Sequence, residues 1–201
     1  MVKKVAIVLL AIGGFFIVAG GYQLFKTNHA QKDSLQQART LLAEQKDETL
    51  GSPLSSNHVD NFNPGHGETV GILNIPRLEA DLPIVEGTDE DELEKGVGHY
   101  NGTAYPQQND QVVLSGHRDT VFRRMGELEL GDTLSVQLPY GDFSYEIVDT
   151  KVVDTDDRSV INPTNQKGSK EVLTVTTCYP FSYVGNAPDR YIITALPVED
   201  N

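Results

Sequence analysis

The sequence predicts a mostly β domain, either a closed or nearly closed barrel or a sandwich, preceded by a membrane-spanning helix. Many short segments rich in Val, Ile, Thr, Tyr and Leu, separated by Gly, Pro, Asn and Asp, predict the β domain. An uncharged apolar run near the N-terminus predicts the helix. With 38% hydrophobic residues, the 201-residue chain can form one ordinary domain plus an appendage.

The apolar run VAIVLLAIGGFFIVAGGYQLF covers residues 5–25 and contains no charged residue. As a helix it would be about 31 Å long, which matches the hydrocarbon core of a bilayer. A cleaved signal peptide is the alternative, because Ala19 and Gly20 are small. The run continues past them without a clear cleavage site, so we expect an uncleaved anchor.

Charges on either side of the anchor predict its orientation. Lys3 and Lys4 precede it and only Lys26 lies close behind it, so the positive-inside rule places residues 1–4 in the cytoplasm. The β domain of this single-pass protein would then be extracellular, at the cell membrane. The formal net charge of −13 argues against nucleic acid as a partner.

Between the anchor and the β domain we expect a helical stalk and a linker. Residues 26–50 are rich in helix formers and carry only a narrow apolar stripe, which indicates a solvated helix. The stripe consists of Leu35, Ala38, Leu41 and Leu42. Residues 51–67 are rich in Gly, Pro, Ser and Asn and are typical of a linker, so the domain is expected over 68–201.

Seven strands are expected in that domain, with room for an eighth. They are TVGILNI, EADLPIVEG, QVVLSG, DTLSVQL, DFSYEIVDTKVV, EVLTVTT and RYIITALPV. The segment LPYGDF is expected to form a tight hairpin turn. One helix is expected among the strands, at residues 88–96, with Thr88 as its N-cap and Gly96 at its end.

The acidic cluster in that helix has two interpretations. Carboxylates in a first turn stabilise the helix dipole, and charge runs are usually solvated faces. Calcium is the alternative because carboxylate oxygens are its preferred ligands, but no loop points several of them inward. We therefore predict no metal site and no cofactor, with calcium stimulation left open. The cluster is Asp89, Glu90, Asp91 and Glu92.

Cys178 is the single cysteine, and it stands at the end of a predicted strand. Without a partner for a disulfide, it is either a small buried hydrophobe or a reactive thiol. A nucleophilic thiol needs a base, and His117 also follows a predicted strand end. Arg190 begins another strand and could stabilise a developing oxyanion, although an ion pair with Asp189 is the alternative.

His99 is the main competitor of His117 for the role of base. His29, His58 and His66 fall in the stalk or linker and are set aside. Spacing alone does not decide between these interpretations.

The residues assembled so far resemble the sortase family. TVTTC with Arg190 twelve residues later is similar to the sortase nucleophile motif, and LSGHRDT resembles the family's histidine segment. The order of strands, helix, GVGHY and histidine loop agrees over residues 68–201. One departure is Val175, where leucine is usual. The resemblance implies a closed eight-stranded β-barrel with short helices, and a structural place for His99.

Several features favour class D sortases of spore-forming Gram-positive bacteria, with class A as runner-up. The chain has no tryptophan and no lid motif, which argues against the lidded pilin polymerases. The segment DTDDRSVINPTNQKGSK is too short for the inserted helix of the class that handles haem-uptake proteins.

What the resemblance implies is cysteine transpeptidation. Cys178 would attack the threonine carbonyl of an LPxT-type sorting signal, with His117 as acid and base and Arg190 on substrate backbone or oxyanion. The acyl group would pass to an amine of the peptidoglycan precursor. The resemblance also suggests signal-binding residues, with a plain surface loop as the alternative for the first two. They are Val160, Ile161 and Thr177.

Two other function classes stay open from the sequence. An exported L,D-transpeptidase or cysteine peptidase would also need a reactive thiol. A non-enzymatic, membrane-tethered β-barrel binding module would carry an inert cysteine.

Overall fold

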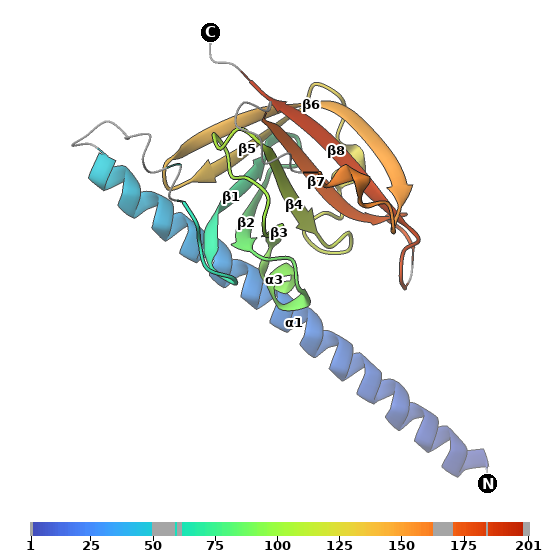
Figure 1. The fold of residues 1–201 in the computed structure, drawn as a ribbon. Coiled ribbons are helices and arrows are strands. Elements are labelled where there is room, and N and C mark those ends of the chain that lie inside the picture. Colours follow the sequence, from blue (N-terminus) through green and yellow to red (C-terminus); the bar gives the residue numbers. More distant parts are fainter. Residues whose placement is uncertain (1, 50–58, 60–61, 163–170, 184, 199–201) are drawn as a thin grey trace.

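The computed structural model describes residues 2–49, 59, 62–162, 171–183 and 185–198. Eight strands close into one barrel in the order β1-β2-β3-β4-β7-β8-β6-β5, as Figure 1 shows. The strands are β1 Thr69–Ile75, β2 Ala80–Glu86, β3 Val97–His99, β4 Gln111–Gly116, β5 Thr133–Leu138, β6 Gly141–Asp154, β7 Val172–Tyr179 and β8 Asp189–Pro197. The expected closed eight-stranded barrel is therefore confirmed, and the sandwich alternative is wrong.

Apolar side chains from all sides fill the barrel. Leu73, Val112, Leu173 and Ile193 come from four different strands and are at most 1% exposed. Burying a side chain of this size contributes about 1.5–3 kcal/mol. Closure also pairs every strand on both edges, which leaves no strand edge open to another chain.

Helix α1, Val2–Thr49, combines the expected anchor and stalk in one continuous helix. It contains the one helix in the described residues that is long and apolar enough to cross a membrane. Its N-terminal half projects beyond the barrel, and its C-terminal half lies along β1 and β2 (Figure 1).

The expectation of a fully solvated stalk is wrong for one face of α1. Ser34 and Ala38 are buried against the barrel, with 6% and 0% exposure. Arg39 also pairs with Asp81 of β2 at 3.0 Å. Because Ser34 and Ala38 are small, the helix backbone comes close to the barrel, and the face of α1 that carries Ala38 is a docking face.

Four further short helices have both ends within the described residues. They are η1 Pro76–Leu78, α3 Glu90–Lys95, η2 Met125–Glu127 and η3 Arg158–Val160. The expected cap at Thr88 is wrong, because the N-cap of α3 is Asp89 and no side chain caps the helix. Its end at Gly96 is confirmed. The acidic cluster is not entirely a solvated face either, since Glu92 is only 6% exposed.

The predicted linker at 51–67 lies partly outside the described residues. In its described part, the ring of Phe62 packs against Tyr105 and Tyr140 at 4.8 and 5.0 Å between centroids. The backbone NH of Gly67 donates to the carbonyl of Glu86. Packing on the barrel therefore begins before residue 68.

Candidate active site

Strand pairing brings the three predicted catalytic residues to one end of the barrel. Strands β4 and β7 are parallel neighbours, and Gly116 pairs with Thr177. The next residues, His117 directly after β4 and Cys178 near the end of β7, therefore lie at the same end of the barrel. Strand β8 runs antiparallel to β7, and its Arg190 pairs directly with Cys178. Neighbouring strands lie about 4.8 Å apart, so backbone pairing alone places the three residues side by side.

Two features fix this strand end. The hydroxyl of Thr177 donates to the carbonyl of Gly116 at 2.7 Å, which ties β7 to β4 one residue before Cys178 and His117. A Cβ at position 116 would lie 2.6 Å from the ring of Phe122, so only glycine fits there. Phe122 is fully buried, and its backbone NH donates to the carbonyl of His117. The histidine segment is therefore anchored in the core.

The free thiol of Cys178 is half-buried and opens onto a cleft of about 580 Å³, here called the strand-end cleft. His117 and Arg190 line the same cleft, so all three predicted residues share one space. One wall comes from the turn at residues 100–103, and the opposite wall comes from residues 155–161.

Arg190 has donors available at this cleft. Its Nη1 donates to the carbonyls of Asp189 and Ala187 at 3.0 and 3.4 Å. The alternative of an ion pair with Asp189 is not seen, and within the described part of the chain no carboxylate pairs with Arg190. The remaining guanidinium donors are therefore free to bind a carbonyl oxygen or an oxyanion.

Arg118 is a residue that sequence reasoning missed. Its Nη2 donates to the carbonyls of Tyr183 and Gly185, both at 2.7 Å, and its guanidinium lies 5.8 Å from the ring centroid of Tyr183. It thus connects the histidine segment to the segment between β7 and β8. Its position next to His117 in LSGHRDT was the only available signal.

The candidate signal-binding residues line the strand-end cleft as well. Val160 and Ile161 stand in the wall that contains η3, and the carbonyl of Val160 accepts a bond from Gln111 Nε2 at 2.7 Å. Residues 163–170, which follow this wall in the chain, lie outside the described residues. Thr177 lines the cleft, but its hydroxyl already donates to Gly116.

Comparison with known proteins decides the family. A sortase domain model matches residues 73–198, and Sortase D of Bacillus subtilis (strain 168) is 52% identical over 96% of this chain and 97% of its own. This chain belongs to the sortase family. Its activity class is therefore cysteine transpeptidation, and the alternative of a non-enzymatic binding module is wrong.

Solved sortase structures agree with this assignment. A Sortase D5 transpeptidase of Clostridium perfringens has 26% identity and a TM-score of 0.64, covering 81% of this chain and 98% of its own. Sortase E1 of Streptomyces coelicolor, solved with a tripeptide in its active site, has 31% identity and a TM-score of 0.59 over 66% of this chain and 90% of its own. The likeness to class D predicted from the sequence is confirmed by the Bacillus relative.

Beside the cleft, this sortase contains a buried polar network. His99 Nδ1 lies 2.6 Å from Glu86 Oε2, and His99 Nε2 lies 3.0 Å from the carbonyl of Ala104. Both ring nitrogens therefore lie within hydrogen-bond distance of an oxygen atom inside the barrel. Tyr105 donates to the same carboxylate, and burial together with that bond raises the pKa of Tyr105 far above its usual value.

The network holds both ends of one wall of the strand-end cleft. Residues 100–103, which form a cleft wall, lie between His99 and Ala104, and both of these are held by the network. His99 itself is 2% exposed and does not line the strand-end cleft.

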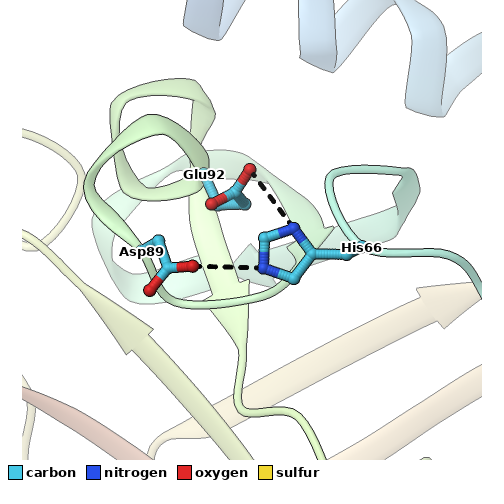
Figure 2. A group of neighbouring side chains, drawn as sticks. All are labelled: His66, Asp89 and Glu92. Atoms are coloured by element: carbon cyan, nitrogen blue, oxygen red, sulfur yellow. Dashed lines mark ion pairs between the residues drawn. The ribbon is translucent and has the colours of Figure 1, made fainter.

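His66, Asp89 and Glu92 form the one group in the described residues whose side chains could converge on a metal ion. Figure 2 shows the imidazole between the two carboxylates, 3.3 Å from Asp89 and 3.7 Å from Glu92. Setting His66 aside as a linker residue missed this contact. Lys95 Nζ also lies 3.8 Å from Glu92, so a lysine of the same helix already pairs with the buried carboxylate. The cluster joins the segment before β1 to α3.

Proposed function

We propose that this protein is a membrane-anchored sortase that cleaves an LPxT-type sorting signal after its threonine and transfers the acyl group to a peptidoglycan amine. The observation that carries the proposal is the strand register, in which Cys178 pairs with Arg190 and follows Thr177 at the end where His117 leaves β4. A nucleophile, a base and a cation thus share one cleft.

In the first step the thiolate of Cys178 attacks the threonine carbonyl. A C–S bond forms, the C–N bond breaks, and His117 gives a proton to the leaving amine. Arg190 stabilises the negative oxygen of the tetrahedral intermediate or binds the backbone of the signal. In the second step an amine attacks the thioester, and the thiol is regenerated. The chemistry uses no cofactor or metal.

The signal lies across the strand-end cleft in this proposal. Val160 and Ile161 offer half-buried apolar side chains for its leucine and proline. Thr177 shapes the floor of the cleft, because its hydroxyl is committed to Gly116.

Helix α1 anchors the enzyme with residues 1–4 in the cytoplasm, residues 5–25 in the bilayer and the barrel outside the cell. Its continuity supports this, because the helix that would span the bilayer runs directly onto β1 and β2 (Figure 1). The strand-end cleft would then meet both the exported protein and a lipid-linked precursor near the outer surface.

The test uses the full chain in detergent micelles with LPxTG, LPxTA and LPxTS peptides and meso-diaminopimelate. Mass spectrometry should detect a thioester on Cys178 and an amide product, and neither should form with Cys178→Ala. An L,D-transpeptidase or a cysteine peptidase is the second candidate. Hydrolysis without any amide product would favour the peptidase, and absence of acylation by all three peptides would refute the proposal.

A further inference from the structure

A second cleft lies on the other side of His117, between helix α1 and the barrel. It measures about 720 Å³ and is here called the helix-side cleft. Gln23, Leu24, Thr27, Asn28 and Gln31 of α1 form one wall. The opposite wall comes from α3 and from the segment 117–124, and Figure 1 shows α1 and α3 side by side. Among the described residues, His117 alone lines both this cleft and the strand-end cleft.

Two carboxylates in the helix-side cleft have no cation. Glu90 and Asp119 are exposed, and neither carboxylate has a hydrogen bond or ion pair among the described residues. Glu94 also lines the cleft, but Gln23 and Lys26 bind it at 3.0 and 2.9 Å. Unpaired carboxylates beside a base suit a ligand that carries a positive charge.

The cationic side chains of the cleft do not neutralise these acids. Arg123 donates to the backbone carbonyl of Asp119, and Arg124 pairs with Glu127 at 2.7 Å. The positive charges of the two arginines partly offset the negative charge of the cleft, but their guanidinium groups bond to other acceptors than these two carboxylates.

The same cleft contains two buried polar atoms without a partner. Gln31 Nε2 and Thr120 Oγ1 are buried and make no hydrogen bond among the described residues, and they come from opposite walls. Leaving a buried polar group unpaired is unfavourable, so such groups usually have a partner in the working state. Each wall of the cleft thus holds one polar atom whose partner is not among the described residues.

We infer that the helix-side cleft binds the amine acceptor, a primary ammonium compound, and delivers it to His117 while the acyl group occupies the strand-end cleft. This inference rests on the proposed function. Neutral His117 removes one proton from the ammonium, and the free amine attacks the thioester carbonyl. The C–N bond forms, the C–S bond breaks, and the second nitrogen proton goes to the Cys178 sulfur. The proton on His117 is then released to solvent.

The two substrates thus occupy separate clefts that share one histidine. Because α1 provides a full wall, the acceptor site is complete only when the helix lies on the barrel. A lipid-linked acceptor would meet this cleft where α1 leaves the membrane.

The test compares two-substrate kinetics of the full chain in detergent micelles, with an LPxTG peptide and meso-diaminopimelate as probes. The double variant Glu90→Gln with Asp119→Asn should raise KM for the amine about fivefold, as expected for two exposed ion pairs. A larger fraction of the acyl-enzyme should be hydrolysed instead of forming amide, while the rate of acylation of Cys178 should change less than twofold. Asp91→Asn is the matched control, because Asp91 is an exposed acid of α3 outside the cleft.

A second variant fills the cleft from the helix alone. Thr27→Trp should also raise KM for the amine, whereas Lys32→Trp, an exposed position outside the cleft, should not. An unchanged KM in both cleft variants would overturn the inference, and so would an equal loss of acylation. If wild-type Cys178 is not acylated at all, the proposed function fails and the inference fails with it.

Discussion

The two clefts that meet at His117 are held together by different forces. The strand-end cleft is built on paired backbones, with β4, β7 and β8 hydrogen-bonded in register and Thr177 locked to Gly116. The helix-side cleft depends on α1, which contacts the barrel through a narrow stripe and a few ion pairs at the surface. The catalytic groups therefore lie on strands that backbone hydrogen bonds hold in register. The wall that α1 contributes to the helix-side cleft is not part of the barrel's hydrogen-bonded sheet.

The largest effect is expected at the residue the clefts share. His117→Gln removes the acid and base of both half-reactions, so acylation and aminolysis should each fall about 10³-fold, within the range for general acid–base catalysis. Rapid-quench mass spectrometry would follow acylation, and a preformed thioester would report aminolysis. His29→Gln, an exposed histidine of α1 outside both clefts, serves as the control. Loss of only one half-reaction would show that His117 does not serve both clefts.

A large loss of stability is expected when the buried network around Glu86 in the barrel is disrupted. Glu86→Gln leaves His99 and Tyr105 around a neutral amide, and removing the charge from a buried pair should cost about 3 kcal/mol of unfolding free energy. Urea unfolding followed by circular dichroism would measure it. Glu146→Gln, at an exposed position of β6, should change the unfolding free energy by less than about 0.5 kcal/mol. A similar small change for Glu86→Gln would mean that the network does not support the cleft wall.

The barrel was predictable because its strands follow local rules. The limits of β1 and β4 equal the predicted segments 69–75 and 111–116, since Gly, Pro or polar residues stand on both sides. Strand β3 was not among the predicted strands, because three residues with a central glycine, Val97–His99, carry almost no strand signal. It forms because β2 and β4 pair with it on both sides.

Contacts between segments far apart in the chain could not be predicted from local sequence patterns. The parallel pairing of β4 with β7 joins Gly116 to Thr177, and only the family resemblance indicated that closeness beforehand. His66 was set aside because its surroundings are rich in Gly and Pro, although it lies between two carboxylates. The docking of α1 was missed because a narrow apolar stripe also occurs on solvated helices.

A moderate effect is expected at the connection between the histidine segment and the β7–β8 segment. Arg118→Lys keeps the charge but loses the fork that binds Tyr183 and Gly185, so kcat/KM should fall about tenfold through misplacement of His117. Steady-state kinetics of peptide cleavage would measure this. Arg77→Lys, a partly exposed arginine outside both clefts, should leave kcat/KM within twofold. An equal loss in both variants would indicate a general effect of arginine replacement.

The smallest effect concerns the ion pair that holds α1 beside the helix-side cleft. The hydrogen bond and charge of Lys26 hold the pKa of Glu94 below its usual value of about 4.3, and Glu94 in turn raises the pKa of Lys26. The stabilising contribution of Glu94 is therefore present above its usual pKa and is lost as pH falls through the lowered value. That of Lys26 is present below about pH 10.4 and is lost as pH rises through the raised value.

Hydrogen exchange in α1 would detect this pair. Residues 27–42 should exchange faster in Glu94→Gln than in the wild-type chain at pH 7, because the variant lacks the charge that binds Lys26. The difference should shrink as pH falls below 4, where protonation of Glu94 makes the wild-type chain resemble the variant. Asp91→Asn should exchange like wild type at both pH values. If Glu94→Gln does the same, the contacts around Ala38 and the Arg39–Asp81 pair hold α1 on the barrel without the Lys26–Glu94 pair, and the helix-side cleft does not depend on that pair.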